Sequence, residues 1–180
     1  MAEHPRHRFQ VLTKHPLRMS AFAGSHQVAP HIWLGTSVEN RKCLWRIDVL
    51  RTVHAGVRWV SFEPLLKDIG AVDLSGIVWA VIGGESAPLN RVRSMHSDWA
   101  RALIAQCRAQ GFAPYMKQLG TLPLDLPKPR HKKGGDMAEW PADLQVKLPT
   151  PPETKAPDAK ATEANPPEAK APDAKTPEVK

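Results

Sequence analysis

The sequence has few of the residues that hold small secreted domains or metal centres together. It contains only two cysteines, Cys43 and Cys107, which lie far apart in the chain. They form neither a disulfide framework nor a zinc-finger spacing. No apolar run approaches the ~18 residues of a membrane span. The His- and Arg-rich start also lacks the apolar segment of a signal peptide. We therefore expect a cytoplasmic protein with no metal site and no membrane contact.

Several catalytic motifs are also missing. There is no G-x-G-x-x-G dinucleotide fingerprint and no H-x-x-x-H pair on a predicted helix. The segment Gly84–Pro88 approaches the nucleophile elbow G-x-S-x-G, but Pro88 stands where the second glycine belongs. That elbow also requires a helix directly after the serine, and a loop is predicted here. These absences argue against a dinucleotide-dependent enzyme, a serine hydrolase and a zinc hydrolase.

The end of the chain is a low-complexity segment. Residues 151–180 repeat a five-residue pattern of proline, an acidic residue and lysine, and Val179 is their only large aliphatic side chain. Such a composition buries too little apolar surface to offset the conformational entropy lost on folding, about 1–2 kcal/mol per residue. We expect residues 150–180 to form a disordered, solvated spacer. A ligand for a proline-recognising partner is the alternative.

The positive charge belongs to the rest of the chain. From Lys147 onward there are six lysines and six acidic residues, so the remaining nineteen basic and twelve acidic residues carry the whole net charge of +7. A basic folded domain favours an anionic partner such as nucleic acid, a nucleotide or phosphate. The basic residues are scattered, however. The start of the chain and residues 131–133 hold the only local clusters.

Short apolar runs alternate with helical patterns. Strands are expected at residues 9–13, 32–38, 57–62, 77–82 and 113–117, and helices at 16–23, 40–54 and 98–110. This order favours right-handed βα units in a parallel sheet. Five strands are too few for a closed eight-stranded barrel of ~250 residues. We therefore expect residues 1–120 to form an α/β domain that is part of an open, TIM-like barrel.

The C-terminal region and the tryptophans complete the fold prediction. Residues 121–149 read as an irregular extension that packs on the body through Trp140 and Leu144. Five tryptophans fall within predicted elements, and core packing is the ordinary role for most of them. These are Trp33, Trp45, Trp59, Trp79 and Trp99.

Polar residues follow each predicted strand. In parallel α/β folds, ligands bind at the carboxyl ends of the strands. The polar residues at these ends are Thr13, Lys14, Ser37, Glu39, Ser61, Glu63, Glu85, Ser86, Lys117 and Gln118. We expect them to form a binding or catalytic rim, although ordinary strand-terminating polar residues would leave the same pattern.

Two features of this rim carry specific chemistry. Gly83 and Gly84 after the fourth strand would let backbone N–H groups approach a ligand closely, beside the carboxylate of Glu85. The candidate catalytic residues are Lys14, Glu63 and Lys117. The two lysines are equally suited to structural ion pairs with the rim glutamates at positions 39, 63 and 85.

Five ordered segments carry a family resemblance. They are FQVLTKHP (9–16), WLGTSVEN (33–40), SFEPLL (61–66), VIGGES (81–86) and MKQLG (116–120), and residues 134–146 match the family's C-terminal end. Together they resemble the phage Gp-thirty-seven/Gp-sixty-eight family, a radical-SAM-like group. The resemblance covers about residues 4–149. Departures from the family pattern are the segment APLNRVRSM after Ser86, and Leu119 in place of an aromatic residue.

The resemblance implies a cofactor site and a missing part. Full-length relatives use S-adenosylmethionine and an iron–sulfur cluster, which is held by a cysteine-rich segment that precedes the part matched here. The resemblance thus implies a truncated or split protein, inactive alone. Its partner would be a separate chain with the missing half, or a second copy. The residues implied near the S-adenosylmethionine pocket are Ser37, Glu39, Gly83, Gly84, Glu85 and Ser86.

Two other functions remain open from the residues alone. The first is a non-catalytic nucleotide or nucleic-acid binding module that keeps the strand-end rim. The second is a metal-free enzyme in which Lys14 or Lys117 acts with a rim glutamate. Ligand binding without turnover would favour the binding module, and turnover in an iron-free preparation would favour the enzyme.

Overall fold

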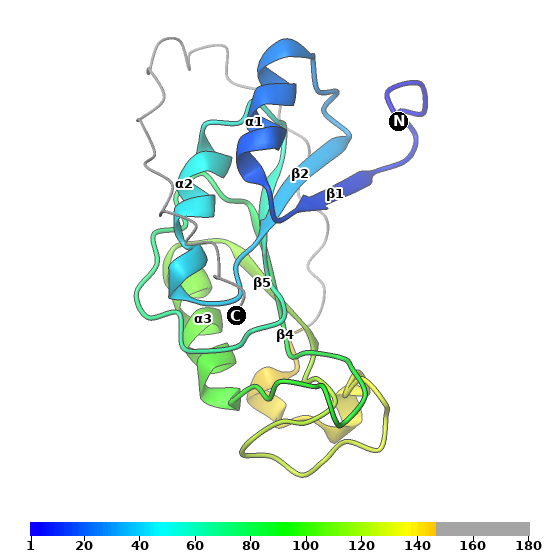
Figure 1. Cartoon of the computed structure of the whole chain (residues 1–180), viewed down its shortest axis with the longest axis vertical. Helices are drawn as coiled ribbons and strands as arrows, with labels where there is room; N and C mark the ends of the chain where they lie inside the picture. Colours follow the sequence, from blue (N-terminus) through cyan, green and yellow to red (C-terminus); the bar gives the residue numbers. More distant parts are fainter. Residues whose placement is uncertain (147–180) are drawn as a thin grey trace, which may run out of the picture.

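In the computed structural model, which describes residues 1–146, five parallel strands form one open sheet (Figure 1). The strands are β1 (Phe9–Thr13), β2 (Ile32–Ser37), β3 (Arg58–Phe62), β4 (Trp79–Gly83) and β5 (Ala113–Gln118). Their spatial order follows the sequence, from β1 to β5. A sheet of the doubly wound type would instead reverse its order at a switch point. The predicted open α/β fold is therefore confirmed.

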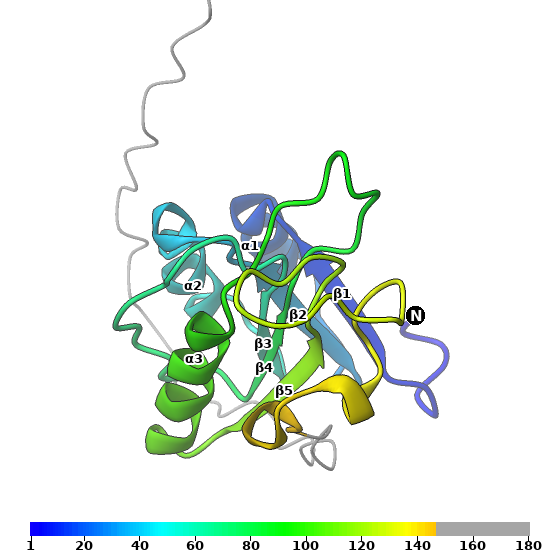
Figure 2. The ribbon, with the colours of Figure 1, turned by 90° about the horizontal axis from the view of Figure 1, so that it is seen from below.

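Three helices cover one face of this sheet. They are α1 (Pro16–Ser25), α2 (Trp45–Arg51) and α3 (Ser97–Ala109), and all three lie on the same side of the strands (Figure 2). The main core fills the space between them, where Leu50 and Leu103 pack with Val60 and Phe62 of β3. Four parallel pairings with helices on a single side are the arrangement of successive βα units in a barrel.

The starts of two helices differ from the sequence prediction. The helix expected at 40–54 is divided into a 3-10 turn, η1 (Arg41–Cys43), and the shorter helix α2. Asn40 caps this turn, since its side chain accepts from the backbone N–H of Lys42. α3 begins at Ser97, one residue before the expected start, and its cap is His96, whose ring accepts from the backbone N–H of Asp98 at 3.2 Å.

The connection between β3 and β4 contains no helix, as expected, and α3 holds it in place. The Gln106 side chain accepts from the backbone N–H of Val72 at 2.9 Å and donates to the carbonyl of Gly70 at 2.9 Å. One turn later, Gln110 accepts from the N–H of Leu74 and donates to the carbonyl of Val72. Two side-chain amides thus replace the backbone partners that this loop lacks.

The residues after β5 pack on the end of the sheet. Two 3-10 turns, η2 (Met137–Glu139) and η3 (Ala142–Leu144), flank the buried Trp140. Its indole donates to the carbonyl of Gly134 at 2.9 Å, and Leu144 is fully buried. Trp140 and Leu144, the two residues expected to pack on the body, both belong to the main core. The spacer predicted at 150–180, and the last three residues of the extension, lie outside the described residues.

No helix within residues 1–146 is long and apolar enough to cross a membrane.

Candidate functional site

Three tryptophans line the sheet face that the helices leave uncovered. Trp33, Trp59 and Trp79 lie on β2, β3 and β4 and form a second cluster with Val57 and Val81. Their exposed fractions are only 2%, 5% and 5%. Core packing was the predicted role for most tryptophans and holds for these three, in a layer separate from the main core. Trp45 is different, because it is 40% exposed.

The tryptophan layer is tightly packed within itself. The Trp59 ring lies against Gly35 of β2, where a Cβ would come within 2.6 Å of the indole, so only glycine fits. Its centroid is 5.2 Å from that of Trp79, which is 6.0 Å from Trp33. Among the described residues, all three indole N–H groups are buried without a hydrogen-bond partner. Buried indole N–H groups normally have a hydrogen-bond partner. This face of the sheet therefore lacks three acceptors that a buried surface usually supplies.

At the carboxyl ends of β2 and β3, the same face carries carboxylates of the rim. In β2, residues at two-residue intervals are Trp33, Gly35 and Ser37, and Glu39 follows. In β3 the corresponding residues are Trp59, Ser61 and Glu63, and Ser37 and Ser61 are register partners. Side chains two apart share one face of a strand. The two-residue spacing from tryptophan to glutamate is thus a sequence signal for this surface. The residues taken one at a time do not show it.

Glu39 is the most buried carboxylate of the rim. Its carboxylate forms ion pairs with Lys14 at 2.6 Å and with Arg46 at 3.1 Å. Burial by itself raises the pKa of Glu39, but the bond from Lys14 and other hydrogen bonds outweigh it, so the pKa lies below its usual value. The carboxylate is therefore fixed in its charged form at neutral pH.

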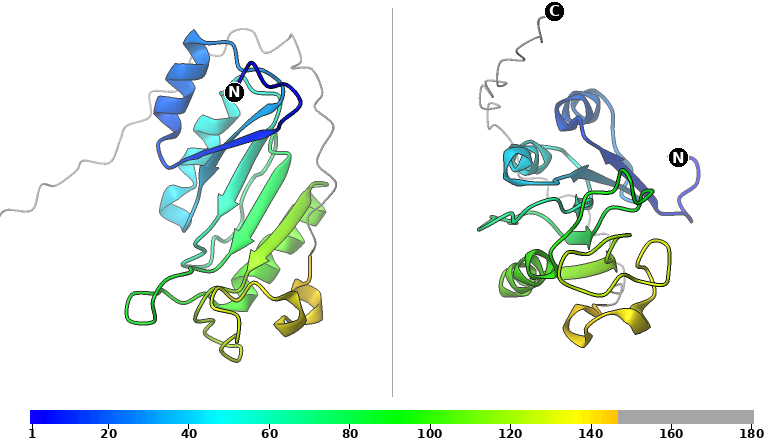
Figure 3. Two further views of the ribbon diagram at one scale, coloured as in Figure 1. Left: turned by 90° about the vertical axis from the view of Figure 1, so that its right-hand side faces the viewer. Right: turned by 60° about the horizontal axis from the view of Figure 1, so that its bottom comes forward.

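Glu63 and Lys117 form the second rim pair, between β3 and β5. Their side chains meet at 2.9 Å. They border a cavity of about 310 Å³ at the carboxyl end of the sheet, together with Glu85, Ser86 and Lys133. In Figure 3 the carboxyl ends of β4 and β5 lie beside the loops that follow these strands. Both ion pairs expected for Lys14 and Lys117 are present, and a catalytic role for either lysine stays a prediction.

Glu85 makes the third rim pair, with a partner from its own loop. The Arg93 guanidinium donates to both carboxylate oxygens, at 2.5 and 3.0 Å, and the Arg93 backbone N–H donates at 2.7 Å. These bonds hold the pKa of Glu85 below its usual value, and the charge of Lys14 lowers it further. Arg93 itself is 59% exposed at its side chain, so solvent reaches this pair.

The glycine pair beside Glu85 has a packing explanation. A Cβ at Gly84 would lie 2.2 Å from the carbonyl oxygen of Leu119. Around it, the Gly84 N–H donates to the carbonyl of Gln118, and the Gln118 side chain donates to the carbonyl of Gly84. A Cβ at Gly83 would contact Gln118 at 3.3 Å. Close approach of β4 to β5 therefore accounts for both glycines without a ligand.

Neither cysteine is suited to an iron–sulfur cluster. Cys43 lies in η1, and Cys107 is fully buried in α3 among the main core. Burial raises the pKa of both thiols, that of Cys107 to about 12. Clusters bind thiolates, and a thiol with a raised pKa stays protonated. The sulfur atoms of residues 1–146 thus fit no cluster site at the rim.

A protein-family model matches most of the sequence. Residues 1–142 match the model of a family described as "Protein of unknown function (DUF5131)". No curated protein and no solved structure matches the sequence. The match spans all five strands and the rim described above.

Proposed function

The chain belongs to the DUF5131 family, and we propose that it forms one wall of a radical-SAM-like barrel of the phage Gp-thirty-seven/Gp-sixty-eight type. In this proposal the strand-end rim binds an adenosine-type ligand, and a further strand-bearing chain or a second copy closes the sheet. The chain alone binds ligand without catalysing the reaction. The observation that carries this proposal is the set of three carboxylates, Glu39, Glu63 and Glu85, at one end of an open parallel sheet.

The shape of the sheet supports the closing partner. The strands follow one another in sequence order, and α1–α3 cover one face only. On the other face, the tryptophan layer (Trp33, Trp59 and Trp79) is buried and its indole N–H groups have no partner within residues 1–146. Facing strands of a closed barrel would cover such a layer.

The rim has the charges needed to orient a zwitterionic ligand such as S-adenosylmethionine. Its ammonium group requires a carboxylate acceptor and its carboxylate requires a cation. Glu85 is the best acceptor, because Arg93 is largely exposed and can be displaced. Lys117 and Lys133 border the same cavity and would face the ligand's carboxylate. The residues present therefore fit this ligand, which would supply the reactive sulfonium group.

The iron–sulfur cluster is different, because the thiols of Cys43 and Cys107 do not fit it. We assign its cysteines to the closing partner and derive no catalytic step within this chain.

Calorimetry with S-adenosylmethionine tests the ligand site. Glu85→Gln should weaken binding by at least about tenfold, the loss expected when a charge-assisted hydrogen bond of about 1.5–3 kcal/mol is removed. Asp143→Asn is the matched control, because Asp143 also pairs with an arginine, Arg101, at 2.5 Å but lies in η3 away from the rim cavity. Absence of binding by the wild-type chain, or equal affinities in all three proteins, would contradict the proposal.

A further inference from the structure

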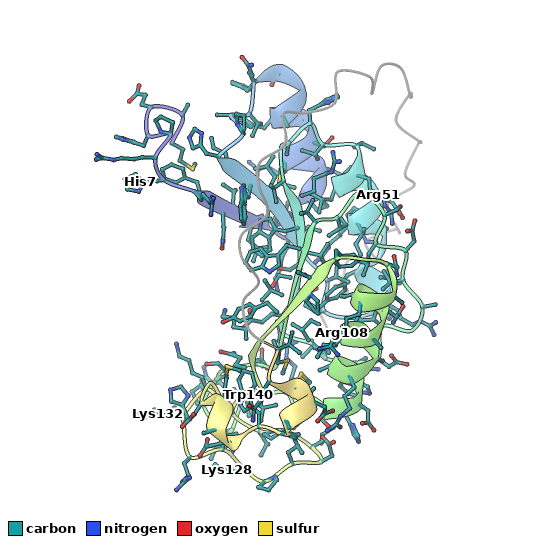
Figure 4. All side chains as sticks on the ribbon, turned by 180° about the vertical axis from the view of Figure 1, so that it is seen from behind. His7, Arg51, Arg108, Lys128, Lys132 and Trp140 are labelled. Atoms are coloured by element: carbon teal, nitrogen blue, oxygen red, sulfur yellow. The ribbon has the colours of Figure 1, made fainter. Side chains whose placement is uncertain are left out.

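A second cavity beside the rim is lined by cations. It has a volume of about 480 Å³ and lies between the loop after β4 and the loop after β5. Its polar lining consists of Ser86, Thr121, Lys128, Arg130, Lys132 and Lys133. Figure 4 shows Lys128 and Lys132 projecting from these loops, with Arg108 on the helix side of the molecule. The basic cavity, as we call it, contains no carboxylate in its lining.

The nearby carboxylates neutralise only one cation of this cavity, Arg130. Glu85 is engaged by Arg93, and Glu139 by Arg130 at 3.0 Å. Within residues 1–146, no ion pair involves Lys128, Lys132 or Lys133. Three lysines therefore contribute uncompensated positive charge to one concave surface, which attracts anions.

Hydrogen bonds fix the loop that presents these lysines. The carbonyl of Lys132 accepts from the Thr121 hydroxyl at 3.0 Å, and that of Lys133 accepts from the N–H of Gly120 at 3.2 Å. The neighbouring His131 ring accepts from the N–H of Gly135 at 3.0 Å. Because the backbone is tied down on both sides, binding an anion here orders little besides the lysine side chains.

The chemistry of the lining selects the ligand class. Lysine, arginine, serine and threonine side chains are the groups that contact phosphates and sugars in nucleic-acid complexes. Binding of unpaired bases would require aromatic platforms, and the cavity lining has none. We propose that the basic cavity binds the phosphate backbone of a nucleic acid, without reading its sequence.

This site is distinct from the proposed ligand site, although the two are adjacent. Ser86 and Lys133 border both cavities, whereas Glu63, Glu85 and Lys117 border only the rim cavity. A strand held in the basic cavity would therefore lie next to the rim. The two proposals can fail separately, because Glu85→Gln tests the rim and leaves the basic cavity intact.

Fluorescence anisotropy with the full chain tests the proposal. The probes are labelled single-stranded oligonucleotides of about twenty nucleotides in two unrelated sequences, with ATP as competitor. Lys128→Glu combined with Lys132→Glu should weaken binding at least tenfold, because both lysines border only the basic cavity. The matched control is Lys42→Glu with Arg108→Glu, because both side chains are exposed and neither borders a cavity described here. This control should weaken binding less than threefold.

Salt dependence and competition distinguish the sources of phosphate. Backbone binding predicts equal affinity for both sequences and a logarithmic salt slope near −0.7 per phosphate contacted, with a smaller slope in the Lys128/Lys132 variant. ATP should compete only at far higher concentration than the oligonucleotide. Equal weakening by both double variants, a strong sequence preference, or full displacement by equimolar ATP would overturn the proposal. Circular dichroism confirms that each variant is folded.

Discussion

At the scale of single residues, backbone approach decides what position 84 accepts. Gly84→Ala would push a Cβ to 2.2 Å from the carbonyl oxygen of Leu119. We predict a loss of about 3 kcal/mol in the free energy of unfolding, the upper range of overpacking costs. Gly24→Ala is the control, because nothing lies within 4 Å of its Cβ in α1 and it should gain about 0.5–1 kcal/mol. Urea unfolding measures both, and an unchanged midpoint for Gly84→Ala would contradict the packing explanation.

The rim residues could be predicted from sequence because strand ends are visible there. Lys14, Glu39, Glu63, Lys117 and Glu85 all reach one end of the sheet in the structure. Their exact pairing could not be predicted. Lys14 pairs with Glu39 because β1 and β2 are neighbours, and Arg93 reaches Glu85 from a loop whose path the sequence does not define.

At the scale of elements, α3 supplies hydrogen-bond partners to the connection between β3 and β4, which has no helix of its own. Gln106→Leu would leave the N–H of Val72 and the carbonyl of Gly70 without their partners. We predict a loss of about 1–3 kcal/mol in the free energy of unfolding and faster hydrogen exchange at Val72. Gln27→Leu, an exposed position, is the control and should change neither. Unchanged exchange at Val72 in Gln106→Leu would show that the connection is ordered without the Gln106 side chain, which contradicts the prediction.

The order of elements could be read from hydrophobic periodicity, but their boundaries could not. The apolar stripe of Leu44, Ile47 and Leu50 begins at the residue that joins η1 to α2 and continues through α2. Periodicity alone therefore predicts one helix where the chain forms two. The glutamine clamp on α3 had no sequence signal, since two glutamines four residues apart are ordinary on an exposed helix face.

At the scale of the whole molecule, the two faces of the sheet differ in what packs against them. The face under α1–α3 has its core complete, with Val60 and Phe62 fully buried. The tryptophan layer on the other face holds three indole N–H groups without partners in the described chain. At its edge, Leu12 of β1 is 45% exposed and is the register partner of Gly35, beside Trp59. This face is the one that a closing partner would cover.

Sedimentation velocity on the full chain at micromolar concentration tests most directly whether this face is completed by another polypeptide. We predict dimers or larger species for the wild-type chain, because an open parallel edge that carries the exposed Leu12 favours association. Leu12→Glu should shift the chain to monomer. Leu89→Glu, a similarly exposed leucine in the loop after β4, should leave association unchanged. A wild-type chain that sediments as a monomer and unfolds in one cooperative, high-temperature transition would show that the five strands are complete by themselves, contradicting the account.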